Sequence, residues 1–237
     1  MRRFTVTIGC IAFLLIATAI ATNPAQAKQA SFNNAKFSNP LVISNPYSPL
    51  VAGTTFIYQG TEDKKSTYEE FIVTDQTKVI QGIETRVVHD TVWTNSKITE
   101  DTFDWFAQDD AGNVWYFGED STQIKNGKVI GHEGSWESGV NGASAGIVME
   151  AKPKVGDTYQ QENAPGIAQD TATVLSLNES VCVAFGCFSN VLKTEEFSPL
   201  EPGVVENKYY ASGVGNIKSF VAQGGSEVSE LVSVVTK

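Results

Sequence analysis

Turn signals recur along this 237-residue chain roughly every 8 to 12 residues, a spacing typical of all-β proteins. No stretch keeps the 3.6-residue apolar period of an amphipathic helix. Segments that alternate apolar and polar residues lie between the turns, and turns are expected at Glu62–Lys65, Gln81-Gly82, Asn95-Ser96 and Asn126-Gly127. The pattern predicts an all-β fold with little helix, in which a curled antiparallel up-and-down sheet forms a half-barrel or barrel with an interior cavity or cleft.

Residues 100–119 form the segment richest in aromatic and acidic residues. They include two of the four tryptophans, three of the thirteen phenylalanines and six carboxylates. Asp110-Ala111-Gly112 suits a three-residue hairpin loop, because Gly112 adopts a positive φ without steric cost. A four-residue loop would shift the register by one, but turn chemistry favours the shorter loop. The predicted pairs are Asp109 with Asn113, Ala107 with Trp115, Trp105 with Phe117, and Phe103 with Glu119.

Side chains alternate between the two faces of this hairpin. The apolar face is expected to build the core, and it carries Phe103, Trp105, Ala107, Trp115 and Phe117. The opposite face is mixed and includes Asp104, Gln108 and Tyr116. A carboxylate facing a cavity there would need a hydrogen bond, a metal ion or a cation such as Arg86 or Lys208, because burying a lone charge is costly. A solvent-facing polar row is the alternative.

The N-terminus has the pattern of a secretory signal peptide: Met-Arg-Arg, an apolar run from about Ile8 to Ile20, and Ala25-Gln26-Ala27. We expect cleavage near Ala27 and export to the periplasm or the extracellular space. Residues 28–50 are expected to be an extended or partly disordered lead-in, and residues 51–237 a single β domain. No segment after the signal peptide is apolar for long enough to be an integral membrane segment.

The chain carries 17 basic and 27 acidic residues. Removal of Arg2 and Arg3 with the signal peptide leaves 15 basic against 27 acidic residues, a net charge of −12. This charge opposes binding to nucleic acid or to an anionic membrane surface.

Two cysteines follow the signal peptide, Cys182 and Cys187, and an oxidising compartment favours a disulfide between them across a turn. A redox-active pair is disfavoured, because the spacing differs from C-x-x-C and no basic residue adjoins it. A metal site would need further ligands.

The chain has two histidines, His89 and His132. His89 lies in a predicted strand, where its neighbour Asp90 points to the other face. His132 lies in the Gly- and Ser-rich segment 131–146, which offers Trp136 few places to bury itself and makes it a candidate ligand contact or lid residue. No G-x-S-x-G motif is present, and Asp109–Asn113 lacks the ligand spacing of a calcium loop. The sequence predicts no cofactor and no metal.

Three phrases resemble those of a widespread family of uncharacterised secreted bacterial proteins. They are Val79-Ile-Gln-Gly-Ile-Glu-Thr-Arg-Val-Val-His-Asp90, Asp104-Trp-Phe-Ala-Gln-Asp109 with Gly112-Asn-Val-Trp-Tyr-Phe-Gly-Glu119, and Pro199-Leu-Glu-Pro-Gly203 with Lys208-Tyr-Tyr-Ala-Ser-Gly-Val-Gly215. The last phrase also resembles the closing hairpin of periplasmic half-barrel proteins, some of which bind lipid or lipoprotein. The resemblance implies a fold and a compartment, and no mechanism.

The sequence therefore predicts a secreted, non-enzymatic β-sheet protein that binds an apolar or amphipathic small molecule, or an envelope protein, in a cleft. The alternative is a secreted hydrolase that uses carboxylates, or a metal held by carboxylates with His89 or His132. A third hypothesis is a purely structural or envelope-associated interaction protein. The candidate ligand-binding residues are Asp104, Gln108, Tyr116, His89, Trp136 and His132.

Overall fold

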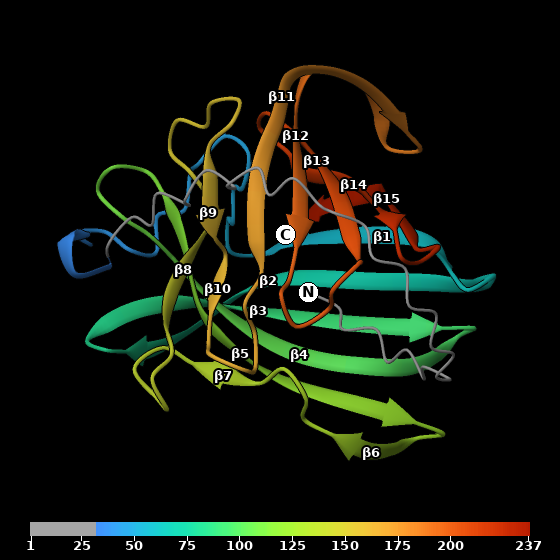
Figure 1. The fold of residues 1–237 in the computed structure, drawn as a ribbon, viewed down its shortest axis with the longest axis horizontal. Coiled ribbons are helices and arrows are strands. Elements are labelled where there is room, and N and C mark those ends of the chain that lie inside the picture. The colour runs from blue at the N-terminus through green and yellow to red at the C-terminus, as the bar shows by residue number, and fades with distance from the viewer. Residues whose placement is uncertain (1–31) are drawn as a thin grey trace, which may run out of the picture.

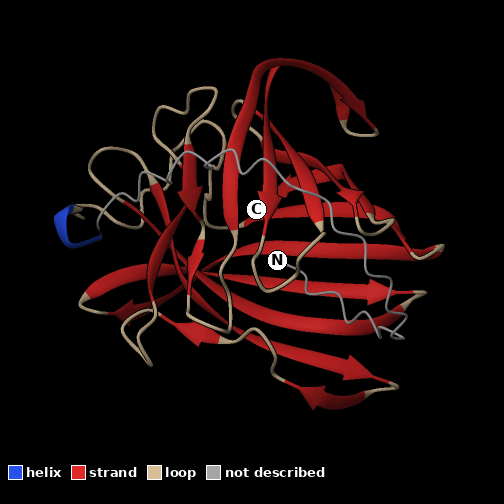
Figure 2. Ribbon diagram, viewed as in Figure 1, coloured by secondary structure: helices blue, strands red, loops and turns tan. Residues whose placement is uncertain are grey.

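The computed structural model describes residues 32–237, so the expected signal peptide lies outside the described residues. This part of the chain is almost entirely antiparallel β-structure; its one helical segment is a 3-10 turn, η1 (Phe32–Asn34) (Figures 1 and 2). No helix within residues 32–237 is long and apolar enough to cross a bilayer. The predicted all-β class with a curled antiparallel sheet is confirmed.

Fifteen strands form one sheet, in the order β10-β8-β5-β4-β3-β2-β1-β15-β14-β13-β12-β11-β9, with β6 and β7 also paired to β5. The strands are β1 (Thr54–Glu62), β2 (Lys65–Ile80), β3 (Ile83–Thr94), β4 (Lys97–Gln108), β5 (Val114–Lys125), β6 (Lys128–Gly131), β7 (Trp136–Glu137), β8 (Ser144–Met149), β9 (Thr158–Gln160), β10 (Glu162–Asn163), β11 (Thr171–Val183), β12 (Gly186–Phe197), β13 (Val205–Ala211), β14 (Gly215–Gln223) and β15 (Val228–Thr236).

One short segment, residues 158–163, links the two ends of the sheet. Its first half is β9, which pairs with β11, and its second half is β10, which pairs with β8. Gln161 lies between the two halves and is 1% exposed. The sheet therefore curls into a nearly closed barrel (Figure 1), and backbone groups at both ends of the strand order have partners on this segment.

The four predicted turns connect consecutive strands as expected, from β1 to β2, β2 to β3, β3 to β4 and β5 to β6. Their central residues have positive φ: 48° and 79° at Gln81-Gly82, 49° and 62° at Asn95-Ser96, and 54° and 72° at Asn126-Gly127. Asp63-Lys64 has the same geometry, with φ of 47° and 66°. Positive φ at both central residues is the type I′ pattern that matches the right-handed twist of a hairpin.

The register of the central hairpin, β4 with β5, is as predicted near the loop and shifts further away. Ala107 lies opposite Trp115, and the amide of Asp109 donates to the carbonyl of Asn113 (3.0 Å). The predicted pair of Phe103 with Glu119 is wrong, because Asp120 lies opposite Phe103 and Glu119 lies opposite Asp104. Trp105 lies where the register shifts, between Asp104 and Phe106.

A β-bulge in β5 causes this shift, and Gly118 makes the bulge sterically feasible. Its φ is +125°, and a Cβ there would lie 2.1 Å from the carbonyl oxygen of Trp136 on β7. Only glycine fits so close an approach. The register beyond the bulge thus depends on a strand that follows the hairpin in sequence.

The apolar face of the hairpin points out of the barrel, and the mixed face points in. Residues 32–50, which we call the N-terminal strap, cover the outer face. The rings of Phe32 and Phe37 lie 5.6 to 6.3 Å from those of Trp115 and Phe117. Phe103 is an exception to the predicted core, because it is 37% exposed and stacks on His89.

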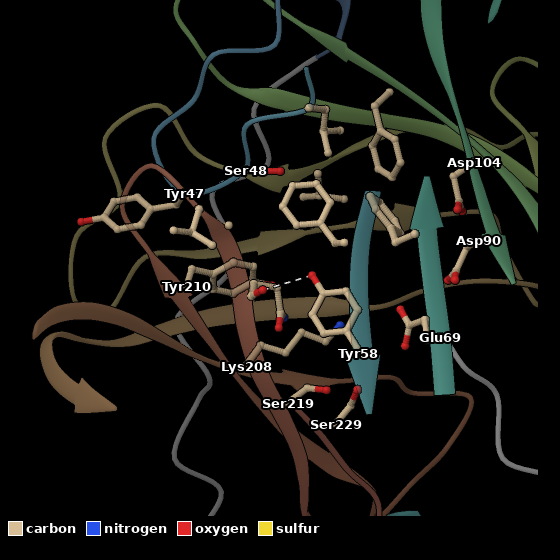
Figure 3. A pocket seen from close by; sticks show the side chains of 18 of the residues that line it. Tyr47, Ser48, Tyr58, Glu69, Asp90, Asp104, Lys208, Tyr210, Ser219 and Ser229 are labelled. Carbon is tan, nitrogen blue, oxygen red and sulfur yellow. Dashed lines mark hydrogen bonds between the residues drawn. The ribbon is translucent and has the colours of Figure 1, made fainter. Parts of the chain in front are cut away.

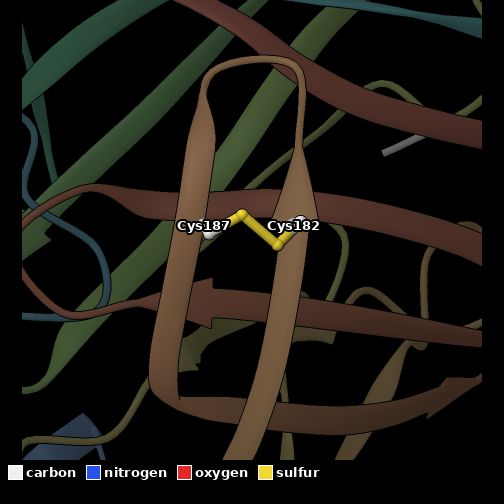
Figure 4. Close-up of a disulfide and its surroundings, with 2 residues drawn as sticks. All are labelled: Cys182 and Cys187. Atoms are coloured by element: carbon white, nitrogen blue, oxygen red, sulfur yellow. A yellow bond between two sulfur atoms is a disulfide. The ribbon is translucent and has the colours of Figure 1, made fainter.

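Cys182 and Cys187 lie opposite each other near the tip of the β11–β12 hairpin and form the predicted disulfide (Figure 4). The amide of Phe185 at this tip donates to the carbonyl of Leu231 on β15 (3.2 Å). Leu231 follows Glu230, where the pairing of β15 with β14 ends. The tip of the β11–β12 hairpin thus hydrogen-bonds to a part of β15 that does not pair with β14.

Replacement of Asp109 by alanine should destabilise the fold. The buried carboxylate accepts hydrogen bonds of 2.8 to 3.0 Å from the amides of Ala111 and Asn113, the side chain of Asn113 and the indole of Trp115. Leaving these donors unsatisfied should lower the free energy of unfolding by about 3 kcal/mol, measured by urea titration. Asp110→Ala in the same loop is the control, because it removes only two exposed hydrogen bonds from Ser38 and should cost less. An equal loss in both variants would contradict the assignment.

Candidate functional site

A cavity of about 220 Å³ lies inside the barrel and is the principal candidate site (Figure 3). Its wall comes from both halves of the sheet and from the end of the strap. The lining residues are Tyr47, Ser48, Pro49, Leu50, Phe56, Tyr58, Glu69, Phe71, Asp90, Asp104, Phe106, Tyr116, Val148, Gln161, Glu206, Lys208, Tyr210, Val214, Gly215, Asn216, Ser219, Glu227 and Ser229.

Aromatic rings form a continuous part of this wall. Phe56 on β1 lies 6.2 Å from Phe71 on β2, which lies 6.5 Å from Phe106 on β4. Phe106 in turn stacks on Tyr116 of β5 at 4.8 Å. These rings come from four strands and provide a surface suited to an apolar group.

Carboxyl groups form a diagonal row beside the rings. Glu69 on β2, Asp90 on β3 and Asp104 on β4 belong to neighbouring strands. Asp90 lies opposite Phe71, two residues from Glu69, and Asp104 lies opposite Val88, two residues from Asp90. Such diagonal neighbours share a face at about 7 to 8 Å. Figure 3 shows the three side chains along one wall.

Lys208 is held on the other wall by its own acidic partners. Its Nζ lies 2.7 Å from Oε2 of Glu196 and 3.4 Å from Oε2 of Glu206. Burial acts to lower the pKa of Lys208, but the charges of Glu196 and Glu206 raise it well above its usual value. The lysine therefore stays charged, and it does not pair with Asp104 as the sequence had allowed.

Asp104 instead shares a proton network with Tyr116 and Glu119. The hydroxyl oxygen of Tyr116 lies 2.5 Å from Oδ1 of Asp104 and 2.9 Å from Oε2 of Glu119. A tyrosine hydroxyl has one proton, so it can donate to only one of the two carboxyls. The other carboxyl must carry its own proton to complete both hydrogen bonds.

The pKa values of these acids agree with a shared proton. Burial raises the pKa of Glu119 to about 8 and that of Asp104 to about 6, although the hydroxyl of Tyr116 acts to lower both. Burial, followed by the charge of Glu69, raises the pKa of Asp90 well above its usual value. The interior therefore holds protons at a pH where exposed carboxylates are ionised.

The strap reaches the mouth of the cavity. The carbonyl of Pro46 accepts a hydrogen bond from the amide of Gly213 (2.7 Å), and Tyr47 to Leu50 line the cavity. Gln108 secures the strap, since its Oε1 accepts from the amides of Ser44 and Asn45 (both 2.8 Å). Of the predicted site residues, Asp104 and Tyr116 line the cavity, whereas Gln108 contacts the strap.

The two histidines do not join this site. Nε2 of His89 contacts Oδ1 of Asp101 (2.6 Å) and Oγ1 of Thr91 (3.2 Å). A Ser-His-Asp arrangement would use both ring nitrogens. Nδ1 of His132 lies 3.0 Å from the carbonyl of Ser121. Among residues 32–237, no group of three or more His, Cys, Asp or Glu side chains could hold a metal ion.

Trp136 lines a second cavity of about 320 Å³ together with Trp105, Lys78 and Glu119. Nζ of Lys78 lies 3.4 Å from the ring centroid of Trp105. Trp136 is 5% exposed, so the expectation that its loop offers few places for burial is wrong: β7 pairs with β5 and packs the indole edge-on against Tyr116. Tyr116 thus connects Asp104 in the first cavity with Glu119 in the second.

Sequence patterns predicted none of Glu69, Asp90, Phe56 and Phe71 as members of one site, and they indicated Lys208 there only as a possible partner of Asp104. The position of Asp90 could have been predicted from the sequence. It lies two residues from Val88 and two from Val92 along β3, and both valines are buried, so the three side chains share one face. That alternation predicts an inward carboxyl. His89, the next residue along β3, points to the opposite face.

No protein-family model and no curated protein matches the sequence. Two solved structures are similar. A Bacteroides fragilis protein classed as exported, with a YmcC-like fold, has a TM-score of 0.47 and 15% identity over 80% of this chain and 99% of that chain. A Parabacteroides distasonis protein classed as a lipoprotein has a TM-score of 0.44 and 10% identity over 81% and 99%. Neither description names a ligand, and identities this low transfer no function.

The stability of the fold should fall as the pH rises from about 5 to 8. The raised pKa of Glu119 means that the folded state keeps a proton that the unfolded state releases above about pH 4.5. Glu119→Gln cannot ionise, so its urea midpoint should fall less. The free energy of unfolding of Glu119→Gln minus that of the native protein should therefore increase by on the order of 2 kcal/mol between pH 5 and pH 8.

The exposed Asp75, replaced by asparagine, provides the control for a lost negative charge. Identical pH slopes for the native protein and Glu119→Gln would show that Glu119 is not the group that holds the proton.

Proposed function

We propose that this protein is exported and binds a small amphipathic molecule inside the barrel, without catalysing a reaction. The observation that carries the proposal is the cavity itself, which joins an aromatic surface from Phe56, Phe71 and Phe106 to a row of carboxyl groups. Binding sites for small molecules commonly combine mainly apolar walls with a few oriented polar groups. The signal-peptide pattern supports export.

The volume limits the part of the ligand that the barrel encloses. A cavity of about 150 Å³ is enough to hold benzene, so a cavity of about 220 Å³ accommodates a ligand part of about six carbons or somewhat more. A chain of six carbons with one polar atom has this size. The aromatic rings would contact the chain, and the carboxyl row would contact its polar end.

The surroundings of His132 do not support a serine hydrolase, which needs a serine hydroxyl hydrogen-bonded to the histidine. The hydroxyl of Ser138 donates to Oε1 of Gln81 (2.5 Å), and that of Ser135 donates to the carbonyl of Ser121 (3.1 Å). Ser138 is thus engaged by Gln81, and the hydroxyl of Ser135 and the ring of His132 contact the same carbonyl of Ser121 rather than each other. A hydrolase and an envelope-protein partner stay predictions from the sequence.

Filling the cavity should abolish binding without unfolding the protein. Ser229 on β15 lines the cavity, and Ser229→Phe would occupy its space. We expect n-hexanol to bind the native protein in isothermal titration calorimetry and to bind Ser229→Phe at least about tenfold more weakly, because overpacked sites lose their room for a ligand. Thermal unfolding would confirm that the variant is folded.

Ser233→Phe makes the same substitution on the same strand but on the other face. Ser233 lies opposite Ile57, whose neighbours Phe56 and Tyr58 line the cavity, so Ile57 and Ser233 point outward. Its affinity for n-hexanol should equal that of the native protein. If n-hexanol does not bind, or if both variants bind it normally, the cavity is not the site.

A further inference from the structure

The carboxyl of Asp90 is buried in the cavity wall with an unused acceptor. Asp90 is 8% exposed, and its Oδ1 has no hydrogen-bond partner within residues 32–237. Figure 3 shows this side chain directed into the cavity between Asp104 and Glu69. A buried acceptor without a partner is costly, so its presence points to a donor that fills the cavity.

The charges that face Asp90 from the surrounding strands are mainly negative. The carboxyl groups that act on it are those of Glu69 on β2 and of Glu100 and Asp104 on β4. The hydroxyl of Tyr58 on β1 also faces it and is neutral. Five carboxyl groups line the cavity, against one basic side chain among the described residues. That residue, Lys208, is already paired with Glu196 and Glu206.

A second unpartnered polar atom in the cavity lining is also an acceptor. Gln161 is 1% exposed, and its Oε1 has no hydrogen-bond partner in the described part of the chain. Gln161 belongs to the segment that links the two ends of the sheet, so it lies on a different element from Asp90. Two open acceptors and an excess of carboxyls suit a ligand that donates several hydrogen bonds and carries positive charge.

We propose that the ligand is an alkylammonium compound whose charged nitrogen binds at Asp90 while its apolar chain lies against Phe71 and Phe106. The inference rests on the proposed function and adds the charge of the ligand to it. An ammonium group has three N–H donors and would supply the positive charge that the carboxyl row lacks. An anionic group would meet repulsion from the same row.

The cation and the proton compete for the same carboxyl. At low pH the buried acids hold protons, so an ammonium group gains no ion pair. As the pH rises, the ammonium displaces the proton and its affinity increases. A neutral ligand of the same length has no such dependence, and this difference separates ion pairing from simple filling of the cavity.

Three probes with the same chain and different head groups test the proposal: n-hexylammonium, n-hexanol and n-hexanoate. At pH 8 the native protein should bind n-hexylammonium at least about tenfold more tightly than n-hexanol, and n-hexanoate most weakly. Between pH 5 and pH 8 the affinity for n-hexylammonium should rise, whereas that for n-hexanol should stay constant. Asp90→Asn should remove both the preference and the pH dependence while n-hexanol still binds.

Asp75→Asn, an exposed change of the same charge, should keep the preference. If n-hexanol binds and n-hexylammonium is no tighter, or if n-hexanoate is the tightest, the cationic ligand is refuted and the cavity function stands. If none of the probes binds, the proposed function fails as well. The head-group comparison uses the native protein, so it decides the question even if Asp90→Asn does not fold.

Discussion

Backbone hydrogen bonding at the two ends of the sheet is the constraint on which the rest of this structure depends. An open sheet of many strands would leave the outer edges of β8 and β11 unpaired, and residues 158–163 pair with both. Once the ends are linked, every long strand has an inner and an outer face. The inner face encloses a cavity, and the outer face needs its own cover, which Phe32 and Phe37 of the strap provide over β5.

Enclosure changes the chemistry of the inner side chains. Carboxyl groups at diagonal positions of β2, β3 and β4 would be ordinary surface acids on an open sheet. Inside the barrel they lose water, and their charged forms become costly. Tyr116 and a shared proton compensate Asp104 and Glu119, and Lys208 compensates Glu196 and Glu206. Asp90 differs, because its buried Oδ1 has no hydrogen-bond partner among the described residues.

The local features of this fold were predictable, and the features that depend on distant contacts were not. The turns at Gln81-Gly82 and Asn126-Gly127 follow from residues that tolerate positive φ, and the disulfide follows from two nearby cysteines. The register beyond Gly118 was mispredicted because the bulge there is shaped by β7. Which hairpin face points inward depends on the strap, and the Glu69–Asp90–Asp104 row depends on the register of three strands.

The pairing of β1 with β15 has a consequence for how the chain folds. Thr54 lies opposite Thr236, so the first and last long strands are neighbours in the middle of the strand order rather than at its ends. Contacts between residues so far apart in sequence form slowly, because closing the intervening loop costs entropy before the contacts stabilise it. β1 cannot find its partner until nearly the whole chain has emerged. Each half of the sheet can assemble from its own hairpins, but the cavity between them exists only after the two halves have joined.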